Sequence, residues 1–496
     1  MTPAANLALE SARRPETLKR VAIEPVTRVE GHGKVTLLLD AENRVQQARL
    51  HIVEFRGFEK FIQGRPYWEV PVLVQRLCGI CPVSHHLAAT KALDRVVGAP
   101  KLTPTAEKLR RLLHYGQTLQ SHALHFFHLA SPDLLFGWDA EPGRRNVVGV
   151  IEAHPEIALK GVRLRRFGQE VIRVLSGKRV HGVFAVPGGV QKHLARTDRD
   201  LLLKDIGQAL LWCREAVGIA RRLYLEDREE NERFGAFHSN FVGLTAPDGC
   251  FELYEGGLRA RDAKGGTIFD QVDPSHYLRH LHEEVKSWSY MKFPFIVALG
   301  NDEGWYRVGP LARVNNADRM PTPLAEEARA DFRKLSEGPV QATMAYHWAR
   351  MIEMLCAAEL IRQLLEDPDL LEGDLLRGGE RVPEGVGVIE APRGTLIHHY
   401  RVDENDAIEK ANLIVSTTHN NTAMNTAVRE VAARYLSGHE LTEGLLNRIE
   451  VAIRAYDPCL SCATHALGRM PLEVDLVDAD GNRVSRIRRD GDGSIG

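Results

Sequence analysis

The sequence lacks several features that would assign a protein to a class at once. Its 64 Lys and Arg residues nearly balance 66 Asp and Glu residues, so the bulk positive charge of a nucleic-acid-binding protein is missing. No apolar run approaches the length of a membrane-spanning helix, about 18 residues. The seven cysteines in 496 residues are too few, and odd in number, for a disulfide scaffold. We therefore expect a protein of a reducing compartment, located in the cytoplasm, without a membrane span or a nucleic-acid partner.

The two ends of the chain differ in composition from the part between them. Residues 1–19 form an N-terminal arm in which Pro15 and Glu16 follow two arginines, where a signal sequence would have its apolar stretch. Residues 478–493 contain few apolar residues to bury and have a basic run, 483–489, flanked by Asp and Gly. We expect one large folded body between these ends, with the C-terminal segment an appendage outside its core.

Hydrophobic periodicity predicts an α+β protein with a predominantly helical body, a central helix bundle and small peripheral sheets. Alternating and β-branched segments predict a hairpin near the N-terminus and a second strand pair late in the chain. Apolar residues at helical spacing predict the long helices. The expected helices cover 105–129, 151–175, 200–225, 274–290, 341–365, 422–435 and 443–456, and the expected strands cover 34–39, 45–53 and two segments within 385–402.

Four of the seven cysteines form two CxxC pairs, Cys78 with Cys81 and Cys459 with Cys462. Four thiolates suit a structural zinc ion, an iron-sulfur or other redox metal centre, or a thiol-disulfide relay. Zinc ribbons usually separate their pairs by about 15 to 20 residues, whereas Cys81 and Cys459 lie 378 positions apart. This separation favours a buried catalytic metal that joins the two ends of the fold, with structural zinc and the relay left as alternatives.

The segments around both pairs are similar to those of the large subunit of nickel-iron hydrogenases. That family has the pattern RxCGxCxxxH near the N-terminus and DPCxxCxxH near the C-terminus, and here these patterns occupy Arg76–His85 and Asp457–His465. Three further motifs of the family follow the same order: Arg28–His32, Arg56–Glu59 and Ala391–Gly394. The resemblance spans residues from about 20 to about 470 and implies the fold of that large subunit.

The resemblance implies a nickel-iron centre with one carbon monoxide and two cyanide ligands on the iron. All four thiolates would bind nickel, and Cys81 and Cys462 would also bridge to the iron. Glu30 matches the carboxylate that receives a proton from Cys459, and His85 would hydrogen-bond near a bridging sulfur. The pocket for the diatomic ligands matches Pro392, Arg393, Leu396, Ser416 and Thr417.

A magnesium site is also implied by the resemblance. Its ligands match Glu59, the backbone carbonyl near Leu413, and His465. Two positions depart from many uptake members of the family, which carry Asp where we align Ser121 and Trp where we align His419. Outside these motifs, we expect buried or interface histidines at His122, His125 and His128 and small apolar fillers at Cys213, Cys250 and Cys356.

The residues that continue both cysteine motifs are most like those of the cytoplasmic, NAD-reducing, bidirectional hydrogenases. The resemblance implies reversible heterolytic cleavage of dihydrogen, with electrons passed through partner subunits to NAD. The chain has no GxGxxG fingerprint at a strand-to-helix turn and no further cysteine cluster. Flavin-containing diaphorase subunits, together with a small iron-sulfur subunit, would therefore carry the FMN, NAD and iron-sulfur clusters. The resemblance also implies a maturation protease that would cut after His465, remove the C-terminal extension, residues 466–496, and leave residues 20–465 as the catalytic body.

Other interpretations remain open at this point. A coenzyme F420-reducing or sulfur-reducing hydrogenase large subunit is the nearest alternative. From another class, a structural zinc protein or a scaffold subunit like the quinone-site subunit of complex I is the rival. That complex I subunit lacks the metal-binding cysteines, so the four cysteines of this chain argue against it.

Overall fold

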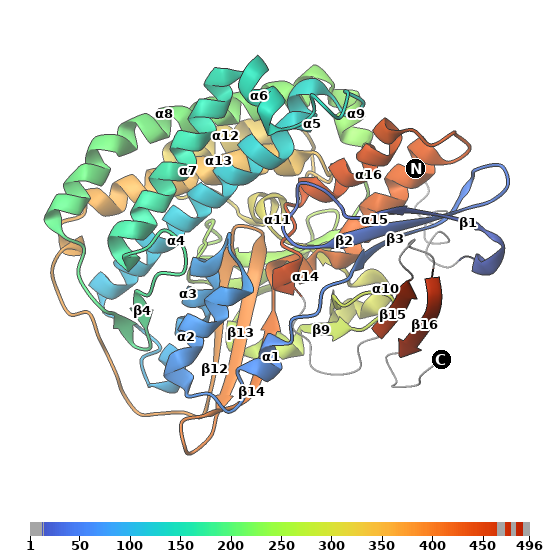
Figure 1. Cartoon of the computed structure of the whole chain (residues 1–496). Coiled ribbons are helices and arrows are strands. Elements are labelled where there is room, and N and C mark those ends of the chain that lie inside the picture. The colour runs from blue at the N-terminus through green and yellow to red at the C-terminus, as the bar shows by residue number, and fades with distance from the viewer. Residues whose placement is uncertain (1–11, 13, 464–471, 478–482, 490–496) are drawn as a thin grey trace.

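Long helices form a bundle that fills the upper part of Figure 1. The computed structural model describes residues 12, 14–463, 472–477 and 483–489. Every residue from Ala345 to Glu359 of α13 is buried, so the polar residues Arg350 and Glu353 lie inside the protein. The bundle helices are α4 (Pro104–Leu124), α7 (Pro155–Ser176), α8 (Arg196–Glu226) and α13 (Ala345–Glu366), with α13 packed against α4 and α8. They confirm four of the expected long helices.

Shorter helices pack around the bundle and the sheets. α3 begins at Pro82, directly after Cys81, where a proline suits the first helical turn because that turn needs no N–H donor. The longer members are α3 (Pro82–Val96), α5 (Ser131–Phe136), α6 (Val147–Ala153), α9 (Arg228–Arg233), α11 (Pro310–Asn316), α12 (Pro323–Arg333), α15 (Asn421–Val431) and α16 (Glu443–Ala455). Single turns form α1 (Phe58–Phe61), α2 (Val70–Leu73), α10 (Gly300–Glu303) and α14 (Ser416–His419), and π-helices extend α4 over His125–Ala130 and α15 over Ala432–Leu436.

The strands form small sheets, as expected for this α+β protein. Both predicted strand pairs are present, each in a three-stranded antiparallel sheet: β1 (Lys19–Ile23), β2 (Gly33–Leu39) and β3 (Val45–Ile52), and β12 (Glu384–Ala391), β13 (Gly394–Val402) and β14 (Ile408–Ile414). A four-stranded sheet has the order β11 (Tyr306–Arg307), β6 (Asn240–Thr245), β7 (Gly257–Arg261), β8 (Thr267–Val272). Two-stranded pairs are β4 (Ala185–Val186) with β5 (Gly189–Val190), β9 (Leu281–Glu284) with β10 (Phe293–Ile296), and β15 (Leu472–Val477) with β16 (Arg483–Arg489).

The helix expected over 274–290 is wrong. Asp273 caps a short 3-10 helix over Pro274–Arg279, and the chain then extends into β9. β9 pairs antiparallel with β10, so that Leu281 lies opposite Ile296. The spacing of Tyr277 and Leu281 fits a helix, but both residues are buried in a cluster with Ile296. Pairing with a strand further along the chain overrides the local helical pattern.

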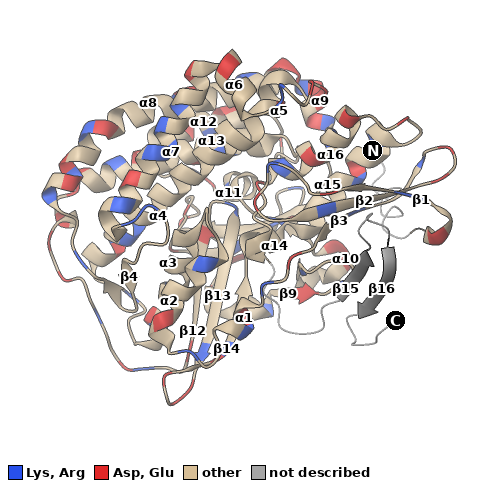
Figure 2. Cartoon of the chain, in the orientation of Figure 1, with Lys and Arg blue, Asp and Glu red and all other residues tan. Residues whose placement is uncertain are grey.

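Charged residues of both signs alternate over the outer faces of α7, α8 and α9 (Figure 2). On α9, for example, Arg228 pairs with Glu232 and Arg233 pairs with Glu229, each at 2.6 Å and one helical turn apart. No helix among the described residues has the length and apolar character that crossing a membrane requires.

The segment between β1 and β2 lies against the segment that follows α16, so the two ends of the body meet. The backbone amide of Leu460 donates to the carbonyl oxygen of Glu30 at 2.9 Å, and Glu30 and Cys459 form an isolated parallel β-bridge. β12 and β13 are buried along most of their length and pack against α3. This arrangement brings the residues after Cys81, the turn between β12 and β13, and the second cysteine pair to one place.

Candidate metal centre

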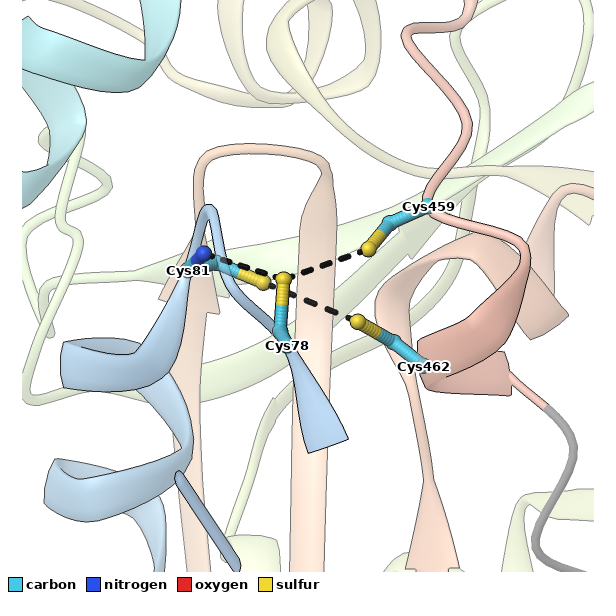
Figure 3. A group of neighbouring side chains, drawn as sticks. All are labelled: Cys78, Cys81, Cys459 and Cys462. Atoms are coloured by element: carbon cyan, nitrogen blue, oxygen red, sulfur yellow. Dashed lines mark hydrogen bonds between the residues drawn. The ribbon is translucent and has the colours of Figure 1, made fainter. Parts of the chain in front are cut away.

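The two cysteine pairs meet inside the protein (Figure 3). The Sγ atom of Cys78 lies 3.3 Å from that of Cys459, and the Sγ atom of Cys81 lies 3.9 Å from that of Cys462. All four sulfur atoms lie within 4.8 Å of one another. The first pair comes from the loop before α3 and the second from the segment after α16. Across the described ranges, no second group of three or more His, Cys, Asp or Glu residues has this closeness.

The chemistry of this quartet suits a thiophilic metal. The four cysteines are between 0% and 6% exposed. Burial raises the pKa of Cys459 and Cys462 well above the usual value, and burial also opposes ionisation of Cys78, whose pKa is nevertheless lowered by hydrogen bonds from the other thiols. Buried sulfurs of this kind become thiolates together when a cation neutralises them. The donor set therefore fits nickel and iron, and on sulfur chemistry alone it also fits zinc.

Glu30 lies beside the quartet and accepts three hydrogen bonds from the second cysteine segment. The Cys459 thiol donates to Oε2 of Glu30 at 2.9 Å, and the backbone amide of Ser461 donates to the same oxygen at 3.2 Å. The Ser461 hydroxyl donates to Oε1. The carboxylate is therefore fixed against the sulfur of Cys459, where it can accept a proton from the thiol.

Arg393 stands in the turn between β12 and β13 and is 2% exposed. Its Nε donates to the carbonyl oxygen of Asp457 at 2.7 Å, its Nη2 to the Asp457 carboxylate at 2.9 Å, and its Nη1 to Oγ of Ser121 at 3.3 Å. Burial would lower the pKa of Arg393, but the negative charge of Asp457 and of the cysteines raises it well above the usual value. The guanidinium is thus a fixed positive charge at the quartet.

The five residues that the resemblance assigned to the diatomic ligands line one small cavity. Cys81, Cys459 and Cys462 contribute to the same cavity. Thr417 also holds the metal segment, because its Oγ1 accepts the backbone amide of Cys459 at 2.9 Å. The cavity residues predicted from the sequence are Pro392, Arg393, Leu396, Ser416 and Thr417, and Ala391, Val415 and His85 complete the wall.

His85 reaches this cavity from α3. Its Nδ1 lies 3.2 Å from Nε2 of His398, whose Nδ1 in turn lies 2.6 Å from the hydroxyl of Tyr400. Burial lowers the pKa of His85 from 6.5 to about 4. The ring is therefore neutral at pH 7 and has a fixed partner at Nδ1.

The predicted magnesium ligands are brought together in part. Glu59 is 3% exposed, and its Oε1 accepts the backbone amide of Leu413 at 2.8 Å. The Leu413 amide supplies one of the hydrogen bonds that a buried carboxylate requires. His465 lies outside the described residues.

The other histidines and cysteines singled out from the sequence do not line the cavity beside the quartet. Nε2 of His122 lies 3.0 Å from Glu353, and Nε2 of His125 lies 2.7 Å from a backbone carbonyl oxygen, so both are buried histidines with partners, as expected. A π-helix from His125 to Ala130 also shifts His128 away from the regular helical spacing. The isolated residues Cys213, Cys250 and Cys356 are buried.

Three residues at the site were not given a role by sequence reasoning. Asp457 was visible in the DPCxxC motif, yet its contact with Arg393 depends on the fold. Ser461 lies between the cysteines of the second pair, and its hydroxyl donates to Glu30. Ser121, aligned where uptake members carry Asp, accepts from Arg393, while His419 at the other departing position lies 2.6 Å from the Tyr306 hydroxyl.

Comparison with protein families gives two matches. A model described as HoxL-like matches residues 20–55, and a model described as nickel-dependent hydrogenase matches residues 56–137 and 254–465. The chain is 48% identical to the NAD-reducing hydrogenase HoxS subunit beta of Cupriavidus necator, over 95% of this chain and 100% of that protein. It is 42% identical to one subunit of the F420-non-reducing hydrogenase of Methanothermobacter thermautotrophicus, over 94% of this chain and 100% of that one.

A solved structure agrees with these sequence matches. The NAD⁺-reducing nickel-iron hydrogenase in its H2-reduced state superimposes with a TM-score of 0.89 and 57% identity, over 90% of this chain and 99% of that chain. The fold expected from the resemblance is thereby confirmed. The chain is more similar to these NAD-reducing enzymes than to the F420-non-reducing one, and both cysteine motifs lie inside the matched ranges. The chain therefore belongs to the nickel-dependent hydrogenases, as a large subunit of the nickel-iron type.

Proposed function

We propose that this large subunit splits dihydrogen reversibly and heterolytically into two protons and two electrons, and that partner subunits pass the electrons to NAD. The observation that supports this proposal best is the buried quartet of thiols, with the Glu30 carboxylate 2.9 Å from the Cys459 sulfur. The choice of NAD is supported by the two NAD-reducing relatives, at 48% and 57% identity.

The four cysteines would hold a nickel-iron centre, with Cys78 and Cys459 as terminal ligands of nickel and Cys81 and Cys462 as bridges to iron. When bound, the centre polarises dihydrogen and takes up its electrons. Arg393 would hold the cyanide ligands, because a guanidinium suits an anion, and the apolar side chain of Leu396 suits carbon monoxide. Pro392, Ser416 and Thr417 complete the walls of this pocket.

The protein residues supply the proton path. The Cys459 thiol donates its proton to Oε2 of Glu30, and Ser461 holds the carboxylate in the receiving orientation through its amide and hydroxyl. His85, neutral at pH 7, would donate a hydrogen bond toward a bridging sulfur. We also propose a magnesium ion near Glu59, with the Leu413 carbonyl and His465 as its other protein ligands.

A small iron-sulfur subunit would dock beside the first cysteine pair. Arg76 and Gly79, on either side of buried Cys78, are exposed. Trp68 and Val72, 53% and 37% exposed, precede Arg76 at helical spacing and extend an apolar surface beside it. Flavin-containing diaphorase subunits carrying FMN, NAD and iron-sulfur clusters would accept the electrons from the small subunit. The complex would reside in the cytoplasm, where NAD is found.

The experiment is to purify the complex through this subunit, identify the co-purifying subunits, and measure nickel, iron and zinc, infrared bands of iron-bound carbon monoxide and cyanide, and dihydrogen-dependent reduction of NAD. We expect nickel, iron, the bands and NAD reduction. Zinc without nickel, or missing bands, would reject the metal centre. Reduction of coenzyme F420 or of polysulfide in place of NAD would reject only the proposed acceptor.

We further propose that a maturation protease removes residues 466–496 after metal insertion, leaving His465 as the C-terminus. Intact mass spectrometry of the active enzyme tests this step. A mass that ends at residue 465 supports cleavage, and an active, full-length subunit contradicts it.

A further inference from the structure

Arg313 on α11 has all five of its guanidinium N–H groups occupied inside the protein. Nε and Nη2 donate to the two oxygens of Glu353 at 2.8 and 2.5 Å, and Nη1 donates to Glu390 at 2.6 Å. The remaining two N–H groups reach the backbone carbonyl oxygens of Ala391 at 3.0 Å and Pro392 at 3.1 Å. The side chains in the Arg313–Glu353 and Arg313–Glu390 ion pairs are between 0% and 1% exposed.

These carbonyl groups belong to the two residues directly before Arg393. Arg313 therefore binds the backbone of the turn between β12 and β13. The N-terminal end of α11 also lies close to this turn, because a Cβ atom on Gly309 would lie only 2.9 Å from the carbonyl oxygen of Arg393. Glu390 is itself held in place by the amide of Leu244 at 3.0 Å and the hydroxyl of Thr395 at 2.7 Å.

His122 closes this network into a ring. Its Nε2 lies 3.0 Å from Oε1 of Glu353, and the preceding residue, Ser121, accepts from Nη1 of Arg393 at 3.3 Å. The ring runs from Arg313 through the Pro392 carbonyl to Arg393, then through Ser121 and His122 to Glu353 and back. Both the backbone and the guanidinium of Arg393 are thus connected to one buried arginine.

We propose that Arg313 is a positioning residue for the metal centre, which sets the place of the Pro392–Arg393 turn over the four cysteines, with His122 closing the ring. The inference rests on the proposed function, in which Arg393 contacts the diatomic ligands. Lysine cannot replace Arg313, because a compact ammonium has three donors and cannot reach two carboxylates and two carbonyls in one plane.

The test compares Arg313→Lys with the matched control Arg110→Lys in the purified complex. Arg110 is equally buried, pairs with Asp94 at 2.6 Å and donates to the backbone carbonyl of Gly189, and these partners lie outside the turn between β12 and β13 that Arg313 binds. We expect Arg313→Lys to retain nickel and iron, to shift the infrared bands of carbon monoxide and cyanide, and to lower kcat for dye reduction about tenfold or more with little change in KM for dihydrogen. The bands should stay in place in Arg110→Lys.

A second variant, His122→Leu, keeps the test decisive if Arg313→Lys does not assemble. It removes the hydrogen-bonding group that faces Glu353, leaves the Arg313–Glu353 pair in place and so opens the ring; we expect a smaller band shift and a smaller loss of kcat. Unshifted bands and parental kcat in metal-loaded Arg313→Lys, or in His122→Leu where the former fails to load, would overturn the proposal, as would an equal shift in Arg110→Lys. A parent enzyme without nickel or without the bands would instead reject the proposed function.

Discussion

Replacing Glu30 by Gln tests the proton step with the smallest change of shape. The amide keeps an oxygen that can accept from Ser461, and the backbone contact between Leu460 and the Glu30 carbonyl is untouched. What is lost is the basic oxygen 2.9 Å from the Cys459 sulfur. Positioned acid-base groups contribute about 10² to 10⁴ to a rate, so we expect dihydrogen–water isotope exchange to fall by about that factor.

The same variant should leave the metal site and the fold in place. One weakened charge-assisted hydrogen bond costs about 1 to 3 kcal/mol of the unfolding free energy, so nickel, iron and the infrared bands should remain. The control is Glu24→Gln, whose side chain is 52% exposed and pairs with Lys34 at the surface. Isotope exchange at the parental rate in metal-loaded Glu30→Gln would refute the assigned proton acceptor.

Three further outcomes are expected. Cys459→Ala should abolish dihydrogen-dependent dye reduction while Cys356→Ala, at a buried site away from the quartet, retains it; retained activity in the first would reject its ligand role. Burial lowers the pKa of His86 and His114 from 6.5 to about 4, so below pH 6.5 the unfolded chain binds protons that the folded protein does not. The denaturation midpoint should therefore fall as the pH drops from about 6.5 toward 4, and an unchanged or rising midpoint would contradict this. Trp68→Asp should reduce co-purification of the iron-sulfur subunit, measured by gel densitometry, with full recovery arguing against that docking surface.

Local patterns were sufficient where one segment determines its own structure. The helices α4, α7, α8 and α13 and the hairpin of β2 and β3 follow directly from apolar spacing, because amphipathic periods are properties of consecutive residues. The helix predicted over 274–290 is wrong because β9 forms only by pairing with β10, and the periodicity of residues 274–290 carries no information about that partner strand. The same limit applies to the π-helix after α4, which interrupts the spacing of the three histidines.

The sequence by itself determined the elements of the metal site: two cysteine pairs at opposite ends of the chain, flanked by motifs whose residue types suit a soft metal. Only the tertiary structure decided how those elements meet. It placed Glu30 against Cys459, gave Arg393 the neighbours Ser121 and Asp457, and connected the turn to Arg313. The physical reason is that these contacts join segments tens to hundreds of residues apart, so their geometry depends on packing that no single stretch of sequence encodes.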